Sequence, residues 1–304
     1  MVPAKKLLNA KIFWKLLKQS FQEWQYDKVS QLAAALAYYT VFSLTPLLVL
    51  AIAIAGAVFG EEAARGEIVG QIQGLVGTSG AEAIETALEN ADQPEISSIA
   101  SLISIGVLLF GASGVFAQLQ EALNAVWNVR AKPSLGIWGF IRKRLLSFSM
   151  VLAIGFLLLV SLVLSAALSA ISHIDFNLLP GLDIVWQLIN FTLSFGLITL
   201  LFALIYKYLP DVKIAWGDVW VGATITALLF SFGKYILGLY LGQGSYGSAY
   251  GAAGSLVIIL AWVYYSAQIL LFGAEFTQVF ARHYGSQIVP DRYAERLPAK
   301  TRPN

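Results

Sequence analysis

Six long apolar runs divide this chain, and each is long enough to cross a lipid bilayer as a helix. A hydrocarbon core of about 30 Å is spanned by roughly 20 helical residues. The runs therefore predict an integral membrane protein, and they exclude an ordinary soluble fold. They are Leu32–Phe59, Ser98–Leu119, Leu145–Ile171, Ile184–Tyr208, Val219–Leu241 and Ala252–Phe276.

The basic residues are sorted onto alternate sides of these runs. Nearly all Lys and Arg lie in the N-terminal arm, in the second and fourth connections and in the C-terminal tail, whereas only Arg65 and Lys234 lie elsewhere. Short basic loops stay in the cytoplasm. The charges therefore predict six transmembrane helices with both termini in the cytoplasm.

Composition supports a single all-α membrane domain with short flanks. The chain of 304 residues is 58% hydrophobic and 12% charged, outside the range of soluble domains. We expect an interfacial arm over residues 1–30, a six-helix membrane domain over 31–281 and a basic cytoplasmic tail over 282–304. The chain has no Cys, which excludes disulfides and thiolate metal sites.

The N-terminal arm has the pattern of an amphipathic helix. Phe13, Leu17, Phe21 and Trp24 recur at spacings of three and four residues, with lysines elsewhere on the helical wheel. A basic helix with aromatic anchors suits a surface of anionic lipid. The alternative is a helix packed against the cytoplasmic end of the bundle, and both roles can coexist.

Two local features break the regular pattern of spans. Pro46 lies in the middle of the first run, where it cannot donate a backbone hydrogen bond, so we expect a kink or a break there. The first outer loop, over about 60–97, is acidic and contains two short amphipathic stretches that Gly77 and Gly80 separate. This pattern predicts a small helical outer loop.

Polar groups at membrane depth are the candidate functional residues. Such groups are costly in lipid and mark transport pathways or ion sites. A polar site at the mouth of an inward-open cavity is one interpretation, and a salt-bridge network at the inner rim is the other. Lys234 has a further alternative, because its long side chain can extend to the outer interface. The candidates are Glu121, Glu275, Gln118, Gln268 and Lys234.

No enzyme constellation is found. The two histidines, His173 and His283, fall on opposite sides of the predicted membrane, so they cannot share a site. The sequence contains no phosphate-binding Gly-Lys loop and no metal-ligand motif. We expect no enzymatic activity, no cofactor or metal, and no nucleic-acid partner.

Three stretches resemble the YihY/BrkB family of bacterial inner-membrane proteins, historically labelled ribonuclease BN. They are AAALAYYTVFSLTPLLV (33–49), YKYLPDVKIAWGDVWVGA (206–223) and YGSAYGAAGSLVIILAWVYYSAQILLFGAEF (246–276). One departure is Gly217, where relatives often have a basic residue. The motif positions are Tyr38, Tyr39, Ser43, Pro46, Pro210, Trp262, Tyr264 and Glu275.

The resemblance implies a six-helix bundle in the bacterial plasma membrane and does not settle an activity. A ribonuclease would need cytoplasmic catalytic residues, which this sequence lacks. A transporter or flippase for a lipid or small solute, acting through a cavity between kinked helices, fits the polar groups at depth. The alternative is a non-catalytic membrane scaffold or partner subunit, and a homo-oligomer is also open.

Overall fold

The computed structural model describes residues 10–91, 98–132, 182–243, 254–286 and 288–297, with residues 139 and 149. The chain begins with α1 (Ala10–Tyr26), α2 (Val29–Phe59), α3 (Glu61–Ala91), α4 (Ser98–Val126) and the short strand β1 (Val129–Ala131). It continues with α6 (Leu182–Tyr208), β2 (Val212–Lys213), α7 (Trp216–Gln243), α9 (Gly254–Tyr284), β3 (Val289–Pro290) and β4 (Ala294–Arg296).

Five of these helices are long and apolar enough to cross a membrane: Val29–Ala57, Gly106–Val126, Phe191–Tyr208, Trp216–Ile236 and Gly254–Tyr284. They correspond to five of the six predicted spans. Of the predicted third span, Leu145–Ile171, only residue 149 is among the described residues. Large apolar side chains such as Phe42, Phe110 and Phe232 are more than 60% exposed on these helices, as expected where lipid replaces water.

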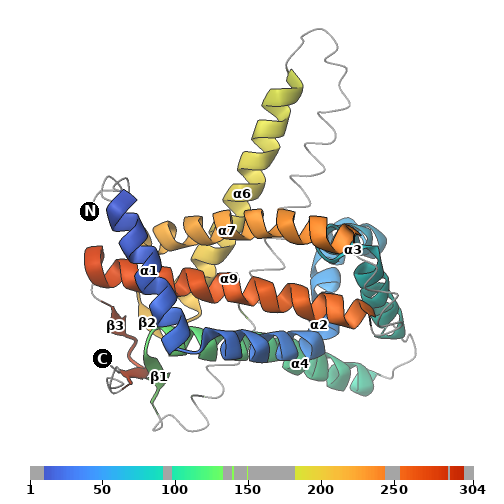
Figure 1. Ribbon diagram of the computed structural model, residues 1–304. Helices are drawn as coiled ribbons and strands as arrows, with labels where there is room; N and C mark the ends of the chain where they lie inside the picture. Colours follow the sequence, from blue (N-terminus) through green and yellow to red (C-terminus); the bar gives the residue numbers. More distant parts are fainter. Residues whose placement is uncertain are drawn as a thin grey trace.

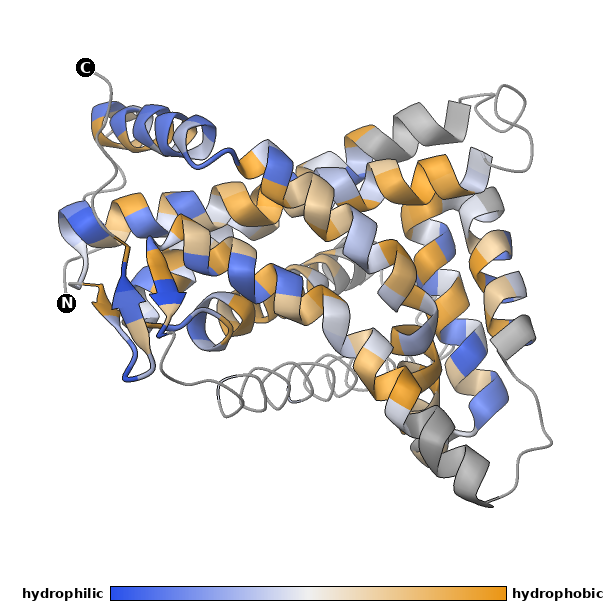
Figure 2. Ribbon diagram, turned by 90° about the horizontal axis from the view of Figure 1, so that it is seen from below, coloured by the Kyte–Doolittle hydropathy of each residue, from blue (hydrophilic) through white to orange (hydrophobic). Residues whose placement is uncertain are grey.

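The helices α2, α4, α7 and α9 run side by side as the bundle, and α1 crosses α9 at one end (Figure 1). Both small sheets lie at that same end, which we call the terminal end because α1 and β4 both lie there (Figure 1). The opposite end carries α3. Hydrophilic residues gather at the terminal end, and hydrophobic residues follow the helices (Figure 2).

The main hydrophobic core lies where the terminal halves of the helices meet. Tyr206, fully buried, donates a hydrogen bond from its hydroxyl to the Leu270 carbonyl at 2.7 Å and lies 2.9 Å from the Thr226 hydroxyl. Gly273 makes this possible, because a Cβ there would overlap the Thr226 hydroxyl and crowd that of Tyr206. The core includes Val29, Leu36, Phe116, Leu123, Phe202, Tyr206, Leu209, Val219, Ala223 and Leu271.

α6 differs from its neighbours because only its C-terminal half joins this core. Phe202, Ile205 and Tyr206 are buried against the bundle, whereas Leu188 and Phe191 are more than 60% exposed. Figure 1 shows its N-terminal half extending away from the other helices.

The structure bears on two local predictions. α2 is one continuous helix through Pro46, so of the expected kink or break the chain does not break there. The proline ring packs against Gly111 of α4, where a Cβ would lie 3.1 Å from it. The outer loop is helical, with a kink at Gly77, where φ is +78°, a conformation that glycine adopts at no steric cost.

The chain is mainly α-helical, as expected, and it has two short strand pairs in addition. Antiparallel pairs β1–β4 and β2–β3 join the tail to the connections after α4 and α6. The pairs contain three and two residues per strand, too short for an alternating pattern to stand out in the sequence. The predicted basic tail is therefore paired with these connections over Val289–Arg296.

Candidate functional site

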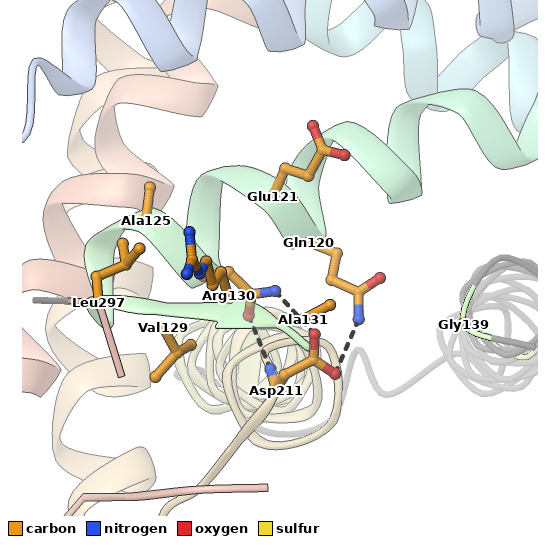
Figure 3. A pocket seen from close by; sticks show the side chains of 10 residues that line it. Gln120, Glu121, Ala125, Val129, Arg130, Ala131, Gly139, Asp211 and Leu297 are labelled. Atoms are coloured by element: carbon orange, nitrogen blue, oxygen red, sulfur yellow. Dashed lines mark hydrogen bonds between the residues drawn. The ribbon is translucent and has the colours of Figure 1, made fainter. Parts of the chain in front are cut away.

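A buried polar contact joins α4 to the connection between α6 and β2. Asp211, which follows Pro210, is buried. The Asn124 side chain donates from Nδ2 to Asp211 Oδ2 at 2.8 Å, and the Asp211 backbone N–H donates to Asn124 Oδ1 at 2.8 Å. Gln120, one helical turn earlier, donates from Nε2 to Asp211 Oδ1 at a longer 3.4 Å. All three bonds can be followed in Figure 3.

These residues line a pocket of about 320 Å³, which we call the Asp211 pocket. Gln120 Oε1 is buried and accepts no hydrogen bond from the residues that the structure describes. Arg130, also in the lining, is paired with Glu295 of β4 at 2.8 Å. Much of the lining is apolar, from Ala125, Val129, Ala131 and Leu297. Its lining is Gln120, Glu121, Asn124, Ala125, Val129, Arg130, Ala131, Gly139, Asp211 and Leu297.

A second polar group, the Glu275 cluster, lies where α1 crosses α9. It consists of Glu23, Asp27, Glu275, Gln278 and Arg282. Arg282 donates to Glu23 Oε1 at 3.1 Å and to Gln278 Oε1 at 2.9 Å. Gln278 in turn donates to the Val126 carbonyl at 2.8 Å. The cluster therefore connects α1, α9 and the end of α4.

Glu275 itself has the least ordinary surroundings of the cluster. Its side chain is completely buried, and among the described residues no N–H or hydroxyl group donates to either carboxyl oxygen. Asp27, Glu23 and Arg282 are its charged neighbours. An isolated buried charge is costly. The cluster thus places a carboxyl without a donor among the described residues where α1 crosses α9.

The structure brings together only some of the residues predicted from sequence. Gln268 lies two turns before Glu275 on α9 and accepts a hydrogen bond from Trp24 Nε1 of α1 at 3.0 Å. Glu121 is exposed at the Asp211 pocket, and Figure 3 shows its carboxylate directed away from Asp211. Gln118 is half-buried, and Lys234 is exposed on α7. Glu121 is the member of this set that lines the Asp211 pocket among the described residues.

Sequence reasoning missed three of the buried polar residues. Glu23 and Asp27 lie four residues apart and continue the buried stripe of Leu16 and Ser20, with Asp27 just after the end of α1, so their spacing was a usable signal. Asp211 carried no such signal, because its partner Asn124 lies 87 residues away.

The family-motif positions separate into two groups. Ser43, Pro210 and Trp262 are buried, and Pro46 packs on Gly111. Tyr38, Tyr39 and Tyr264 are 60%, 45% and 37% exposed, so their side chains face outward from the bundle. Within the described ranges, no group of three His, Cys, Asp or Glu side chains is arranged to hold a metal ion.

Comparison with known proteins gives relatives that are described only as membrane proteins. The chain is 30% identical to the UPF0761 membrane protein of Verminephrobacter eiseniae, over 87% of this chain and 62% of that protein. It is 29% identical to that of Tolumonas auensis, over 83% and 80%, and 30% identical to that of Vibrio parahaemolyticus, over 83% and 77%. No solved structure matches it.

The length of the match varies among these relatives. The chain spans 54% and 53% of the length of the relatives from Ralstonia nicotianae and Rhodospirillum centenum. The family model described as virulence factor BrkB matches residues 20–298, which include every spanning helix and both polar groups described above. The chain is therefore an integral membrane protein of the BrkB family, to which the UPF0761 membrane proteins are similar.

Proposed function

We propose that this protein is a non-catalytic transporter or flippase of the bacterial plasma membrane, which moves a lipid or small solute and exchanges a proton at the Glu275 cluster. The observation that carries the proposal is the burial of Glu275 in a spanning helix without any donor among the described residues. Ionisable groups in such a position are rare in membrane proteins and mark proton relays and substrate pathways.

The cluster also supplies a physical link between a proton and a movement. With Glu275 protonated, α1 can rest against α9. When that proton leaves, three carboxylates face the single guanidinium of Arg282. Two unit charges 4 Å apart repel by about 4 kcal/mol at an effective dielectric constant of 20. That repulsion is enough to shift a two-state equilibrium substantially, so deprotonation favours separation of α1 from α9.

Two pockets at opposite ends of the bundle support alternating access. The Asp211 pocket lies at the terminal end. A second pocket of about 440 Å³ lies between α2 and α3, where it is lined by Val49, Gly56, Glu61 and Arg65 among others. The two linings have no residue in common. Transporters bind their cargo between helices that open to one side at a time. Two separate pockets, one at each end of the bundle, fit that cycle.

The well-packed core around Tyr206 favours a second candidate, a scaffold or partner subunit that transports nothing. Tyr206, Thr226 and the Leu270 carbonyl fill the space between α6, α7 and α9 with satisfied hydrogen bonds. A scaffold has no need of a buried carboxyl without a donor, which is why we prefer transport.

The two candidates are separated by reconstituting the full chain into liposomes and following a fluorescent phosphatidylglycerol between leaflets, with and without a pH gradient. We expect movement that depends on the gradient. Glu275→Gln should abolish the dependence, whereas Glu121→Gln, an exposed carboxylate near the same end, should retain it. Folding of each variant is checked by its elution profile in detergent. Equal, gradient-dependent movement by wild-type protein and Glu275→Gln would refute the role of Glu275.

A further inference from the structure

The groove between α1 and the last turn of α9 has the features of a binding site for a phosphate group. Its volume is about 730 Å³, within the range of small-molecule sites. We call it the α1 groove. Its lining is Lys15, Lys18, Gln19, Gln22, Glu23, Tyr26 and His283.

The charge of the α1 groove is positive. The one carboxylate of the lining, Glu23, is already paired with Arg282 at 3.1 Å, and its side chain is only 8% exposed. Lys15 and Lys18 are exposed. The Nδ1 atom of His283 lies 3.0 Å from the Val279 carbonyl oxygen. Because a carbonyl oxygen can only accept a hydrogen bond, Nδ1 carries the hydrogen in this contact. The other ring nitrogen, Nε2, is then available to a ligand. The amides of Gln19 and Gln22 and the phenol of Tyr26 complete the lining. These donor groups suit an anion that is rich in acceptor oxygens.

The position of the groove on α1 indicates where that anion would come from. Trp14 and Phe21 are 70% and 49% exposed and, seven residues apart, share one face of the helix. Lys15 and Gln22 share the adjoining face, about 100° round the helix axis. Aromatic side chains on an interfacial helix lie at the boundary between head groups and acyl chains. With Trp14 and Phe21 placed there, Lys15 and Gln22 come to the level of the lipid phosphates.

We infer that the α1 groove binds the phosphodiester head group of an anionic phospholipid, with Lys15 and Lys18 as its charge partners. Zwitterionic lipids carry an ammonium group that would meet the same lysines, so the groove should discriminate against them. This inference does not rest on the proposed transport, since a scaffold could bind the same lipid.

The test is native mass spectrometry of the full chain in detergent, titrated separately with short-chain phosphatidylglycerol, short-chain phosphatidylcholine and inorganic phosphate. We expect tighter binding of phosphatidylglycerol than of phosphatidylcholine. Lys15→Gln with Lys18→Gln should weaken phosphatidylglycerol binding by about thirty-fold, the effect of two lysines at an anionic surface. Lys28→Gln with Lys213→Gln removes two exposed lysines outside the groove and should leave binding within about two-fold.

Three results would overturn the inference. Equal affinity for the two lipids would remove the head-group selectivity. Equal weakening by the two double variants would indicate general attraction to a basic surface. Displacement of phosphatidylglycerol by inorganic phosphate at similar concentrations would make the groove a site for free phosphate instead of a lipid. Because binding alone is measured, these results are independent of whether the protein moves any cargo.

Discussion

Asn124 is the side chain whose removal we expect to loosen the terminal end of the bundle most. Asn124→Ala deletes two hydrogen bonds of 2.8 Å, one to the Asp211 carboxylate and one from the Asp211 backbone N–H. Gln120→Ala deletes one bond of 3.4 Å to the same carboxylate. The two residues lie one turn apart on α4, so the pair compares strong and weak contacts with one partner.

The expected magnitudes follow from those distances. A hydrogen bond to a charged group contributes about 1.5–3 kcal/mol and a neutral one about 0.5–1.5 kcal/mol. The free energy of unfolding should therefore fall by about 2–4 kcal/mol in Asn124→Ala and by about 1 kcal/mol or less in Gln120→Ala. At about 2 °C per kcal/mol for a chain of this size, the expected falls in Tm are about 4–8 °C and about 2 °C or less.

The measurement is thermal unfolding in detergent, followed by intrinsic fluorescence for the wild-type chain and each variant. Gln118→Ala is the control, because Gln118 lies half-buried on the same helix and should change Tm by no more than about 1 °C. If Gln120→Ala lowered Tm as much as Asn124→Ala, the ranking by bond length would be wrong. An unchanged Tm in Asn124→Ala would show that the contact with Asp211 does not stabilise the bundle.

Three further predictions concern packing, charge and topology. Gly273→Val should yield little folded protein by size-exclusion chromatography, because the valine side chain would overlap Thr226. Gly196→Ala should be recovered like wild type, because a Cβ at position 196 has no neighbouring atom within 4 Å. Arg282→Gln should lower Tm by about 2–6 °C, because it removes a charged hydrogen bond to buried Glu23 that contributes about 1–3 kcal/mol. Adding Glu23→Gln should recover part of that loss, and a purely additive double variant would contradict the pairing. Single cysteines introduced in α1 and in β4 should react with an impermeant maleimide from the same side of the membrane. The chain has no Cys of its own, so there is no background labelling. Labelling from opposite sides would refute the predicted topology.

Much of the helical framework could be predicted because the signals are local. Apolar runs of about 20 residues predict spanning helices, and five of the six predicted runs correspond to helices of sufficient length and apolar character. The helical outer loop followed from its amphipathic pattern and from Gly77. The helix does not break at Pro46, and the proline ring packs on Gly111 of a neighbouring helix, a contact that is not visible in the local pattern.

The candidate site could be predicted only in part. Glu275 was singled out because a carboxyl in an apolar run is unusual, and it proves to be fully buried. Glu121 lies at the Asp211 pocket and Lys234 is exposed on α7. Their side chains could not be placed from sequence, because depth along a helix says nothing of the face on which a side chain lies. Asp211 escaped notice because its partner Asn124 lies 87 residues away.

The sequence by itself determined that the chain belongs in a membrane, since hydrophobicity is summed over consecutive residues and needs no knowledge of tertiary contacts. Only the tertiary structure decided which polar groups meet. Glu23 and Arg282 are 259 residues apart and lie 3.1 Å from each other, and α1 covers Glu275 because the turn at Lys28 brings it across α9. Charge pairs and hydrogen bonds depend on distances of a few ångströms, and such distances are set by the packing of whole helices.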